Sequence, residues 1–198
     1  MTGPVAVILA GGEARRLGGI DKTLIPLGGT PILSHILSRL QPQVARIALG
    51  ANGDPTRFAA YGLPVLADRQ HRIGPLAGLL RGLEWAAEQD APALLTVPGD
   101  TPFIPHDLLS ALQPAPSVAV SGGRRHHLVA LWPVGWGPLL AAYLAGLSAD
   151  APRRAYGARA FADTLGMRAV PFDTAAGDPF FNVNTPDDRA AAERMLRW

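Results

Sequence analysis

The chain alternates short β-rich runs with amphipathic helical segments along its whole length. Short, mostly apolar runs bounded by glycine or proline indicate buried strands, as in Val5–Leu9 and Ala93–Val97. Apolar residues that recur every three or four positions indicate helices, as in Ile32–Leu40 and Leu76–Glu88. This alternation favours a mostly parallel sheet with helices on both faces, which is a three-layer α/β fold.

The same patterns place the remaining elements. Further strands are predicted at Arg46–Leu49, Pro64–Ala67 and Arg168–Phe172, and a hairpin through Gly122-Gly123 is predicted to join Ser117–Val120 to Leu128–Trp132. Further helices are predicted at 107–112, 137–146, 152–165 and 187–197, the last with Thr185 as N-cap and Pro186 at its first position. Because no repeat or low-complexity linker divides the sequence, we expect residues 1–198 to form one domain.

Composition excludes several classes of function. The chain has no cysteine, which removes disulfides, thiolate catalysis, zinc ribbons and iron–sulfur clusters. Its net charge is only +2 and no basic stripe carries interleaved aromatic residues, so a nucleic acid partner is not expected. Its apolar runs are far shorter than the roughly 20 residues that span a bilayer, and its N-terminus has no signal-peptide pattern. We therefore expect a cytoplasmic protein with no membrane partner.

The segment after Val5–Leu9 has the composition of a phosphate-binding loop. Ligands of parallel α/β sheets bind beyond the carboxyl ends of the strands. Glycines expose backbone N–H groups that can cradle an anion, and they occur here at 11, 12, 18 and 19. Positive charge comes from Arg15, Arg16 and Lys22, which is the only lysine among 18 basic residues. The combination suits a triphosphate, although the spacing matches neither a Walker A motif nor G-x-G-x-x-G.

A carboxylate follows the strand Ala93–Val97. Asp100 lies in the segment Pro98-Gly99-Asp100-Thr101-Pro102, which fixes it between prolines at the end of the strand. Mg²⁺ usually takes one or two protein carboxylates and completes its shell with water and phosphate oxygens, so Asp100 needs no acidic neighbour. The structural alternative is an Asx turn or a helix cap before the next helix.

Polar residues also follow two other predicted strands. Asn52 and Asp68 are such residues, and a carboxylate can read guanine, which presents N1–H and an exocyclic amino group as donors. Either side chain could equally bind ribose hydroxyls, and isolated turn residues of these types are more often structural.

Three further features come from the remaining sequence. Gly74-Pro75-Leu76-Ala77-Gly78 opens a helix whose N-terminus favours negative charge. Asn182-Val183-Asn184 places two amides on one side of an extended segment, where they could hold a substrate or a metal-bound water. His126 lies in the predicted hairpin, where it could face a second substrate.

Together these motifs resemble the molybdenum cofactor guanylyltransferase family. The matching segments follow the family's order across nearly the whole chain and are Leu9–Gly12, Arg15–Lys22, Asp68, Gly74–Gly78, Pro98–Pro102 and Asn182–Pro186. The resemblance implies a Rossmann-like nucleotidyltransferase fold that transfers GMP from GTP to the terminal phosphate of molybdenum-loaded molybdopterin, with release of pyrophosphate. It also implies partners beyond the substrates, namely molybdoenzyme-specific chaperones and upstream molybdenum-insertion enzymes.

The motifs and the resemblance together assign roles to single residues. The residues expected to bind GTP are Leu9, Ala10, Gly11, Gly12, Lys22, Asn52, Asp68 and Asp100. Asp100 is also the expected Mg²⁺ ligand, Lys22, Asp100 and Arg15 are the expected catalytic residues, and Asn182, Asn184 and His126 are the expected contacts of the pterin acceptor. The family often has a nucleotide-contacting asparagine at the position of Gly50, so that contact is either absent here or supplied by Asn52.

The chemistry fits these residues independently. A phosphate monoester has a second pKa of about 6, so the acceptor is largely dianionic at neutral pH and needs no general base. It needs alignment with the α-phosphorus and relief of charge repulsion, which Lys22, a loop arginine and Mg²⁺ on Asp100 would supply. Three alternatives remain open: a cytidylyltransferase acting on the same pterin, a sugar-phosphate nucleotidyltransferase, and a non-catalytic nucleotide-binding adapter.

Overall fold

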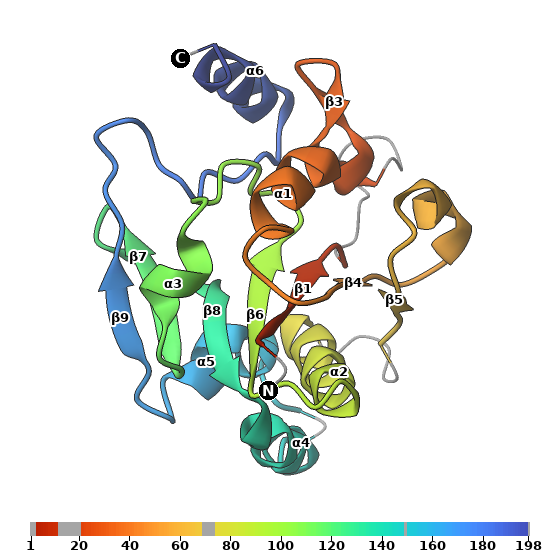
Figure 1. Ribbon diagram of the computed structural model, residues 1–198. Coiled ribbons are helices and arrows are strands. Elements are labelled where there is room, and N and C mark those ends of the chain that lie inside the picture. Colours follow the sequence, from red (N-terminus) through yellow and green to blue (C-terminus); the bar gives the residue numbers. More distant parts are fainter. Residues whose placement is uncertain (1–2, 12–20, 69–73, 149, 198) are drawn as a thin grey trace.

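The computed structural model describes residues 3–11, 21–68, 74–148 and 150–197. A seven-stranded sheet lies between two layers of helices (Figure 1). The strand order is β5-β4-β1-β6-β8-β7-β9, and β8 runs antiparallel to both of its neighbours while the other pairs are parallel. The prediction of a three-layer, mostly parallel α/β fold is therefore confirmed.

The strands lie close to where the sequence places them. They are β1 (Val5–Leu9), β4 (Ile47–Gly50), β5 (Val65–Leu66), β6 (Ala93–Pro98), β7 (Ser117–Ser121), β8 (Arg124–Pro133) and β9 (Arg168–Pro171). The second strand of the predicted hairpin begins earlier than predicted, at Arg124 instead of Leu128. Gly122 and Gly123 both have positive φ, 53° and 76°, which closes a two-residue turn in which Ser121 pairs directly with Arg124.

Each face of the sheet is covered by its own set of helices. One core cluster joins the β1 residues Ala6 and Ile8 to the helices α1 (Ile32–Leu40), α3 (Leu108–Leu112) and α6 (Pro186–Met195). The opposite cluster joins Val5 and Val7 to the helices α2 (Pro75–Glu88), α4 (Gly137–Ala145) and α5 (Ala158–Ala162). Alternate residues of β1 thus face opposite layers, as the two-residue period of a strand requires.

The prediction of one helix over residues 152–165 is wrong. A 3-10 turn, η5 (Arg153–Tyr156), is followed by the short helix α5, and Gly157 between them has an extended backbone with φ −85° and ψ 144°. The apolar spacing continues across Gly157, which is why the sequence pattern hides the break. The other unpredicted elements are η2 (Lys22–Leu24), β2 (Pro26–Leu27), β3 (Thr30–Pro31), η3 (Pro55–Tyr61) and η4 (Val134–Trp136), all too short or irregular to show a helical or strand period.

Three parallel strands end at the same edge of the sheet. Leu9 at the end of β1 is in register with Gly50 at the end of β4 and with Pro98 at the end of β6. This edge points upward in Figure 1, toward α6 and the β2–β3 ribbon. The residues that follow these strands are therefore brought together, as the sequence predicts for a ligand site.

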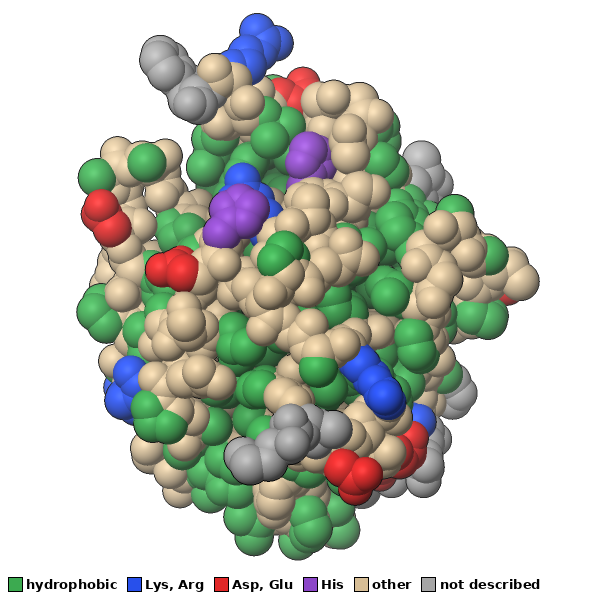
Figure 2. Space-filling model, viewed as in Figure 1, with side chains coloured by type: hydrophobic (Ala, Val, Ile, Leu, Met, Phe, Trp, Pro, Cys, Tyr) green, Lys and Arg blue, Asp and Glu red, His purple; other side chains and the backbone are tan. Residues whose placement is uncertain are grey.

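The surface agrees with the small net charge. On the face seen in Figure 2, lysine and arginine side chains are scattered among polar and apolar ones and do not gather in a stripe. In the described ranges, the helices are all too short or too polar to cross a bilayer.

Candidate active site

A cavity of about 700 Å³ opens at the carboxyl ends of β1, β4 and β6. One part is lined by Leu9, Ala10 and Gly11 at the end of β1, by Lys22 in η2 and by Asp100 after β6. The other part is lined by β8 residues from Arg124 to Val129, by Arg153 and by the start of α5. Lys22 and Asp100, two of the three predicted catalytic residues, therefore line one cavity.

Glycines give the side chain of Leu9 its space in the cavity wall. A Cβ atom built on Gly50 or on Gly78 would lie 3.3 Å from Leu9 Cδ2. A side chain at position 50 would therefore force Leu9 to shift by a few tenths of an ångström. Glycine at position 50 thus leaves the space in which the Leu9 side chain packs.

Asn52 contacts Asp68 directly. Its Nδ2 donates to Asp68 Oδ2 at 2.8 Å, and its Oδ1 accepts from the Asp68 backbone N–H at 2.8 Å. Asp68 lines the cavity, whereas Asn52 is not among its lining residues. The structure thus places Asn52 behind Asp68, where it fixes the direction of the carboxylate.

An ion pair that sequence reasoning missed holds the segment before Lys22. Asp21 accepts from Thr23 N at 3.1 Å and from Thr23 Oγ1 at 2.7 Å, which caps η2. Its other carboxylate oxygen pairs with Arg57 Nε at 3.0 Å, and Arg57 also donates to the Asn52 carbonyl at 2.7 Å. The loops after β1 and β4 are thereby joined. A single arginine in an irregular segment gives no sequence signal for this role.

The two asparagines of the 182–184 segment contact Lys22 and Asp100. Asn184 Oδ1 accepts from Lys22 Nζ at 2.5 Å, and Asn182 Nδ2 donates to Asp100 Oδ1 at 2.7 Å. The Val183 N–H also donates to the Asp100 carbonyl at 2.9 Å. These asparagines are predicted contacts of the acceptor, and the structure shows that they also fix the two charged side chains on which catalysis is expected to depend.

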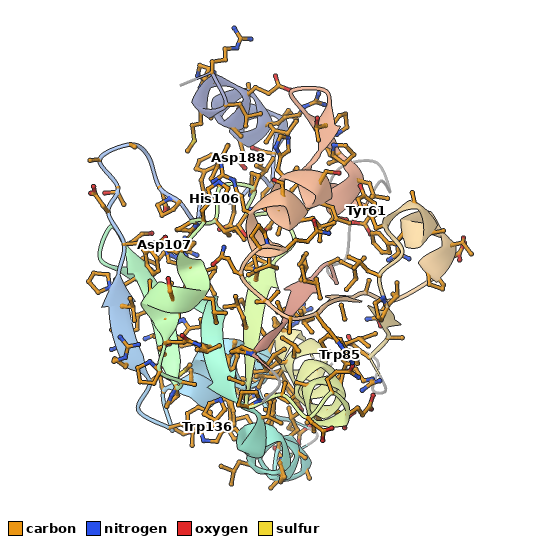
Figure 3. All side chains as sticks on the ribbon, viewed as in Figure 1. Tyr61, Trp85, His106, Asp107, Trp136 and Asp188 are labelled. Carbon is orange, nitrogen blue, oxygen red and sulfur yellow. The ribbon has the colours of Figure 1, made fainter. Side chains whose placement is uncertain are left out.

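The start of α6 fixes Asn184 in turn. Asp188, labelled in Figure 3, accepts from the backbone N–H groups of Asn184 at 3.0 Å and of Thr185 at 2.9 Å. Thr185 Oγ1 accepts from Asp188 N at 3.1 Å and completes a capping box, which confirms Thr185 as the N-cap. Hydrogen bonds with Thr185 and Asn184 lower the pKa of Asp188, and the charge of Lys22 lowers it further. The helix cap and the lysine thus share one hydrogen-bonded cluster.

Two predicted site residues cannot be placed. Gly12 and Arg15 lie outside the described residues. His126 lines the cavity from β8, as the prediction of a hairpin residue facing the site requires.

Sequence comparison identifies the family. A family model for the MobA-like NTP transferase domain matches residues 6–164. The molybdenum cofactor guanylyltransferase of Acidiphilium cryptum is 52% identical over 189 residues, which cover 95% of this chain and 93% of that protein. The chain belongs to the molybdenum cofactor guanylyltransferase family. The predicted family and the prediction of a nucleotidyltransferase enzyme are therefore confirmed.

Solved structures share the fold of this family member. Molybdopterin-guanine dinucleotide biosynthesis protein A from Archaeoglobus fulgidus has a TM-score of 0.73 at 20% identity, over 98% of each chain. A Mycobacterium tuberculosis protein crystallised in complex with manganese has a TM-score of 0.68 at 18% identity, over 98% of this chain and 99% of that one. At such identities the likeness establishes the fold alone.

Burial shapes the electrostatics of Asp100 in this guanylyltransferase family member. Removal of the carboxyl from solvent raises its pKa above the ordinary value, while the hydrogen bond from Asn182 and the charge of Lys22 act in the opposite direction. Ionisation of Asp100 therefore lowers the free energy of unfolding when no cation is bound.

Asp100→Asn is expected to raise the melting temperature of the unliganded enzyme at neutral pH. Because the folded-state pKa is raised, the contribution of Asp100 to stability is present at low pH and is lost as pH rises through that pKa. The gain from the neutral amide should therefore grow with pH and disappear in acid. Thermal unfolding at several pH values without nucleotide or metal checks this, with the exposed Asp173→Asn as the control. An equal gain at every pH would contradict it.

Gly99→Ala is expected to destabilise the enzyme by about 1–3 kcal/mol because it overpacks the site. A Cβ atom at position 99 would lie 2.5 Å from Thr23 Cγ2 and 3.2 Å from both Ala10 Cα and the Leu9 carbonyl oxygen. Two of these atoms belong to the backbone and cannot turn away. The matched control is Gly135→Ala, since a Cβ there meets nothing within 4 Å. Urea unfolding of both variants measures the difference, and equal stabilities would refute the packing argument.

Proposed function

We propose that this enzyme transfers GMP from GTP to the terminal phosphate of molybdenum-loaded molybdopterin, forming molybdopterin guanine dinucleotide and pyrophosphate. The observation that carries the proposal is the convergence of Lys22 and Asp100 on one cavity, with one asparagine holding each. The choice of guanine and of the pterin acceptor is supported by the name of the relative from Acidiphilium cryptum, which matches almost the whole chain.

In this proposal GTP lies against the carboxyl ends of the strands. Leu9, Ala10 and Gly11 contribute the surface after β1, where the Ala10 N–H is already held by the Gly50 carbonyl at 2.9 Å. Asp68, oriented by Asn52, provides a carboxylate that accepts hydrogen bonds from guanine donors or ribose hydroxyls. Lys22 provides a compact positive charge for the phosphates.

The transfer step needs positioning more than proton transfer. An oxygen of the acceptor phosphate attacks the α-phosphorus of GTP, a new P–O bond forms, and the bond to the β-phosphate oxygen breaks as pyrophosphate leaves. Because the acceptor is largely dianionic at neutral pH, no side chain has to remove its proton. Lys22 offsets the repulsion between the two anions, and the predicted role of Arg15 would add to this.

Asp100 is the residue that would hold a divalent cation. Its carboxylate lies in the cavity and is tied at Oδ1 to Asn182, and its burial favours a bound cation that would compensate the ionised form. When bound, Mg²⁺ would neutralise phosphate charge and hold the phosphates in line. A protein of the same fold has been crystallised with manganese, which supports a divalent cation here.

The second part of the cavity is proposed to receive the acceptor. Arg124, Arg125 and Arg153 line it and give it the positive charge that suits an anionic substrate. Asn182 and His126, which line the cavity, are proposed to contact the acceptor together with Asn184, which bonds Lys22. It remains a prediction that chaperones and molybdenum-insertion enzymes are partners of this protein. A cytoplasmic location and a single domain over residues 1–198 are also still predictions.

The decisive experiment is incubation of the enzyme with GTP, Mg²⁺ and molybdenum-loaded molybdopterin. We expect mass analysis to detect the guanine dinucleotide, with one pyrophosphate released for each product. Unlabelled CTP should not compete with GTP for binding. Preferential binding of CTP would replace the guanylyl assignment by a cytidylyl one, and no product with either nucleotide would refute the proposed acceptor.

A further inference from the structure

Three side chains form a hydrogen-bonded chain that ends at the cavity wall. Ser121 Oγ donates to Asp178 Oδ1 at 2.7 Å and lies 2.7 Å from His126 Nε2. The same Asp178 oxygen accepts from the Phe180 N–H at 2.9 Å, which fixes the carboxylate. Ser121 is 3% exposed, whereas His126 lines the cavity. A buried hydroxyl and a carboxylate thus stand behind a residue that faces the substrate.

The donors and acceptors in this chain determine which ring nitrogen of neutral His126 carries the proton. A hydroxyl has one proton, and an ionised carboxylate can only accept, so the Ser121 proton goes to Asp178. Ser121 Oγ is then an acceptor toward His126, and Nε2 must donate to it. The neutral ring therefore carries its proton on Nε2 and has an unprotonated Nδ1.

The surroundings keep this ring neutral and in place. Burial lowers the pKa of His126, and Arg124 and His127 act in the same direction, while Asp178 opposes them. The ring packs against Phe180 with 4.9 Å between the ring centroids. Within the described part of the chain, no group forms a hydrogen bond with Nδ1, which leaves this nitrogen for a ligand.

We propose that Asp178 and Ser121 are positioning residues that hold His126 with Nδ1 as a hydrogen-bond acceptor for an N–H group of the pterin ring. The inference rests on the proposed function and extends it to recognition of the acceptor. Arg124 and Arg125 line the same part of the cavity and can only donate, so they suit the anionic groups of the substrate. Pterin N–H and amino groups are donors and need a hydrogen-bond acceptor. A neutral histidine provides one without adding negative charge.

The first test determines which ring nitrogen of His126 is protonated. Nitrogen-15 NMR of the imidazole rings at neutral pH should show His126 with a protonated Nε2 and an unprotonated Nδ1. Free imidazole side chains also favour this tautomer, so Ser121→Ala is the informative comparison, and it should shift the nitrogen signals toward a mixture of tautomers. The matched control is Ser117→Ala on the same strand, because the Ser117 hydroxyl is also buried and donates to the Leu112 carbonyl instead of contacting His126. A proton on Nδ1 in the wild type, or an unchanged spectrum in Ser121→Ala, would overturn the proposal.

The second test compares two amide replacements kinetically. His126→Gln keeps a donor near the place of Nε2 and loses the acceptor, whereas His126→Asn keeps an oxygen near the place of Nδ1. We expect Ser121→Ala and His126→Gln to raise KM for the pterin substrate about tenfold, as loss of one hydrogen bond implies, with KM for GTP unchanged. His126→Asn should be affected less.

The outcomes separate this inference from the proposed function. A wild-type enzyme that makes no guanine dinucleotide refutes the proposed function, and the NMR comparison still decides whether Ser121 fixes the ring. An active wild type whose KM for the pterin changes less than twofold in Ser121→Ala and His126→Gln refutes the role of His126 in acceptor recognition. Equal KM values for His126→Gln and His126→Asn would also refute Nδ1 as the recognising atom.

Discussion

Asp100→Ala should abolish pyrophosphate release while leaving the fold intact. Asp100 lines the cavity, and loss of its carboxylate would remove both the proposed cation ligand and the partner of Asn182. Removal of one preorganised electrostatic group in an active site typically costs about 10²–10³-fold in rate, and loss of a cation with it should cost at least that much. A coupled pyrophosphate assay with saturating GTP and Mg²⁺ measures the effect.

The fold should survive this change because Asp100 is held by its backbone as well as by its side chain. The Val183 N–H bonds the Asp100 carbonyl, and an alanine keeps that contact. Circular dichroism and melting temperature should therefore match the wild type or exceed it. Asp173→Ala, which removes an exposed carboxylate far along the chain, should keep full activity. Normal pyrophosphate release from Asp100→Ala would contradict the assigned role of this carboxylate.

Lys22→Ala is expected to reduce kcat/KM by about 10²–10³-fold, since it removes a fixed positive charge from the cavity. Lys22→Arg should recover only part of the rate. The guanidinium is planar and wider than the ammonium, and it would have to fit where Lys22 Nζ lies 2.5 Å from Asn184 Oδ1. Steady-state kinetics with GTP as the varied substrate measure both variants.

Asn184→Ala completes this series because it leaves the ammonium and removes only its partner. Its rate should fall between those of the wild type and Lys22→Ala. A wild-type rate for Lys22→Arg would show that the single lysine among 18 basic residues reflects codon usage instead of chemistry.

The positions of the strands and their mostly parallel sheet could be predicted from the sequence because they depend on local patterns. Short, mostly apolar runs locate β1 and β6. Because parallel strands end at a common edge of the sheet, Leu9 and Asp100 are expected to lie near one another. The N-cap of α6 could also be predicted from the sequence, since Thr185, Pro186 and Asp188 lie within one turn. The lone lysine and the aspartate after β6 are unusual enough in their segments to stand out.

Contacts between distant segments could not be predicted in the same way. Asn184 and Lys22 are 162 positions apart, and Asn182 and Asp100 are 82 apart, so no spacing rule relates them. Arg57 and Ser121 are ordinary residues in sequence, and they gain their roles from Asp21, Asp178 and His126 in the fold. The break at Gly157 was hidden because the apolar period continues through it.

The contacts of the 182–184 segment have a consequence for biosynthesis of the protein. A ribosome makes this segment after all seven strands of the sheet, because β9 ends at Pro171. A chain that lacks this segment therefore keeps the sheet-forming residues but has neither the Lys22–Asn184 nor the Asp100–Asn182 hydrogen bond, so both charged side chains should be held less firmly in it.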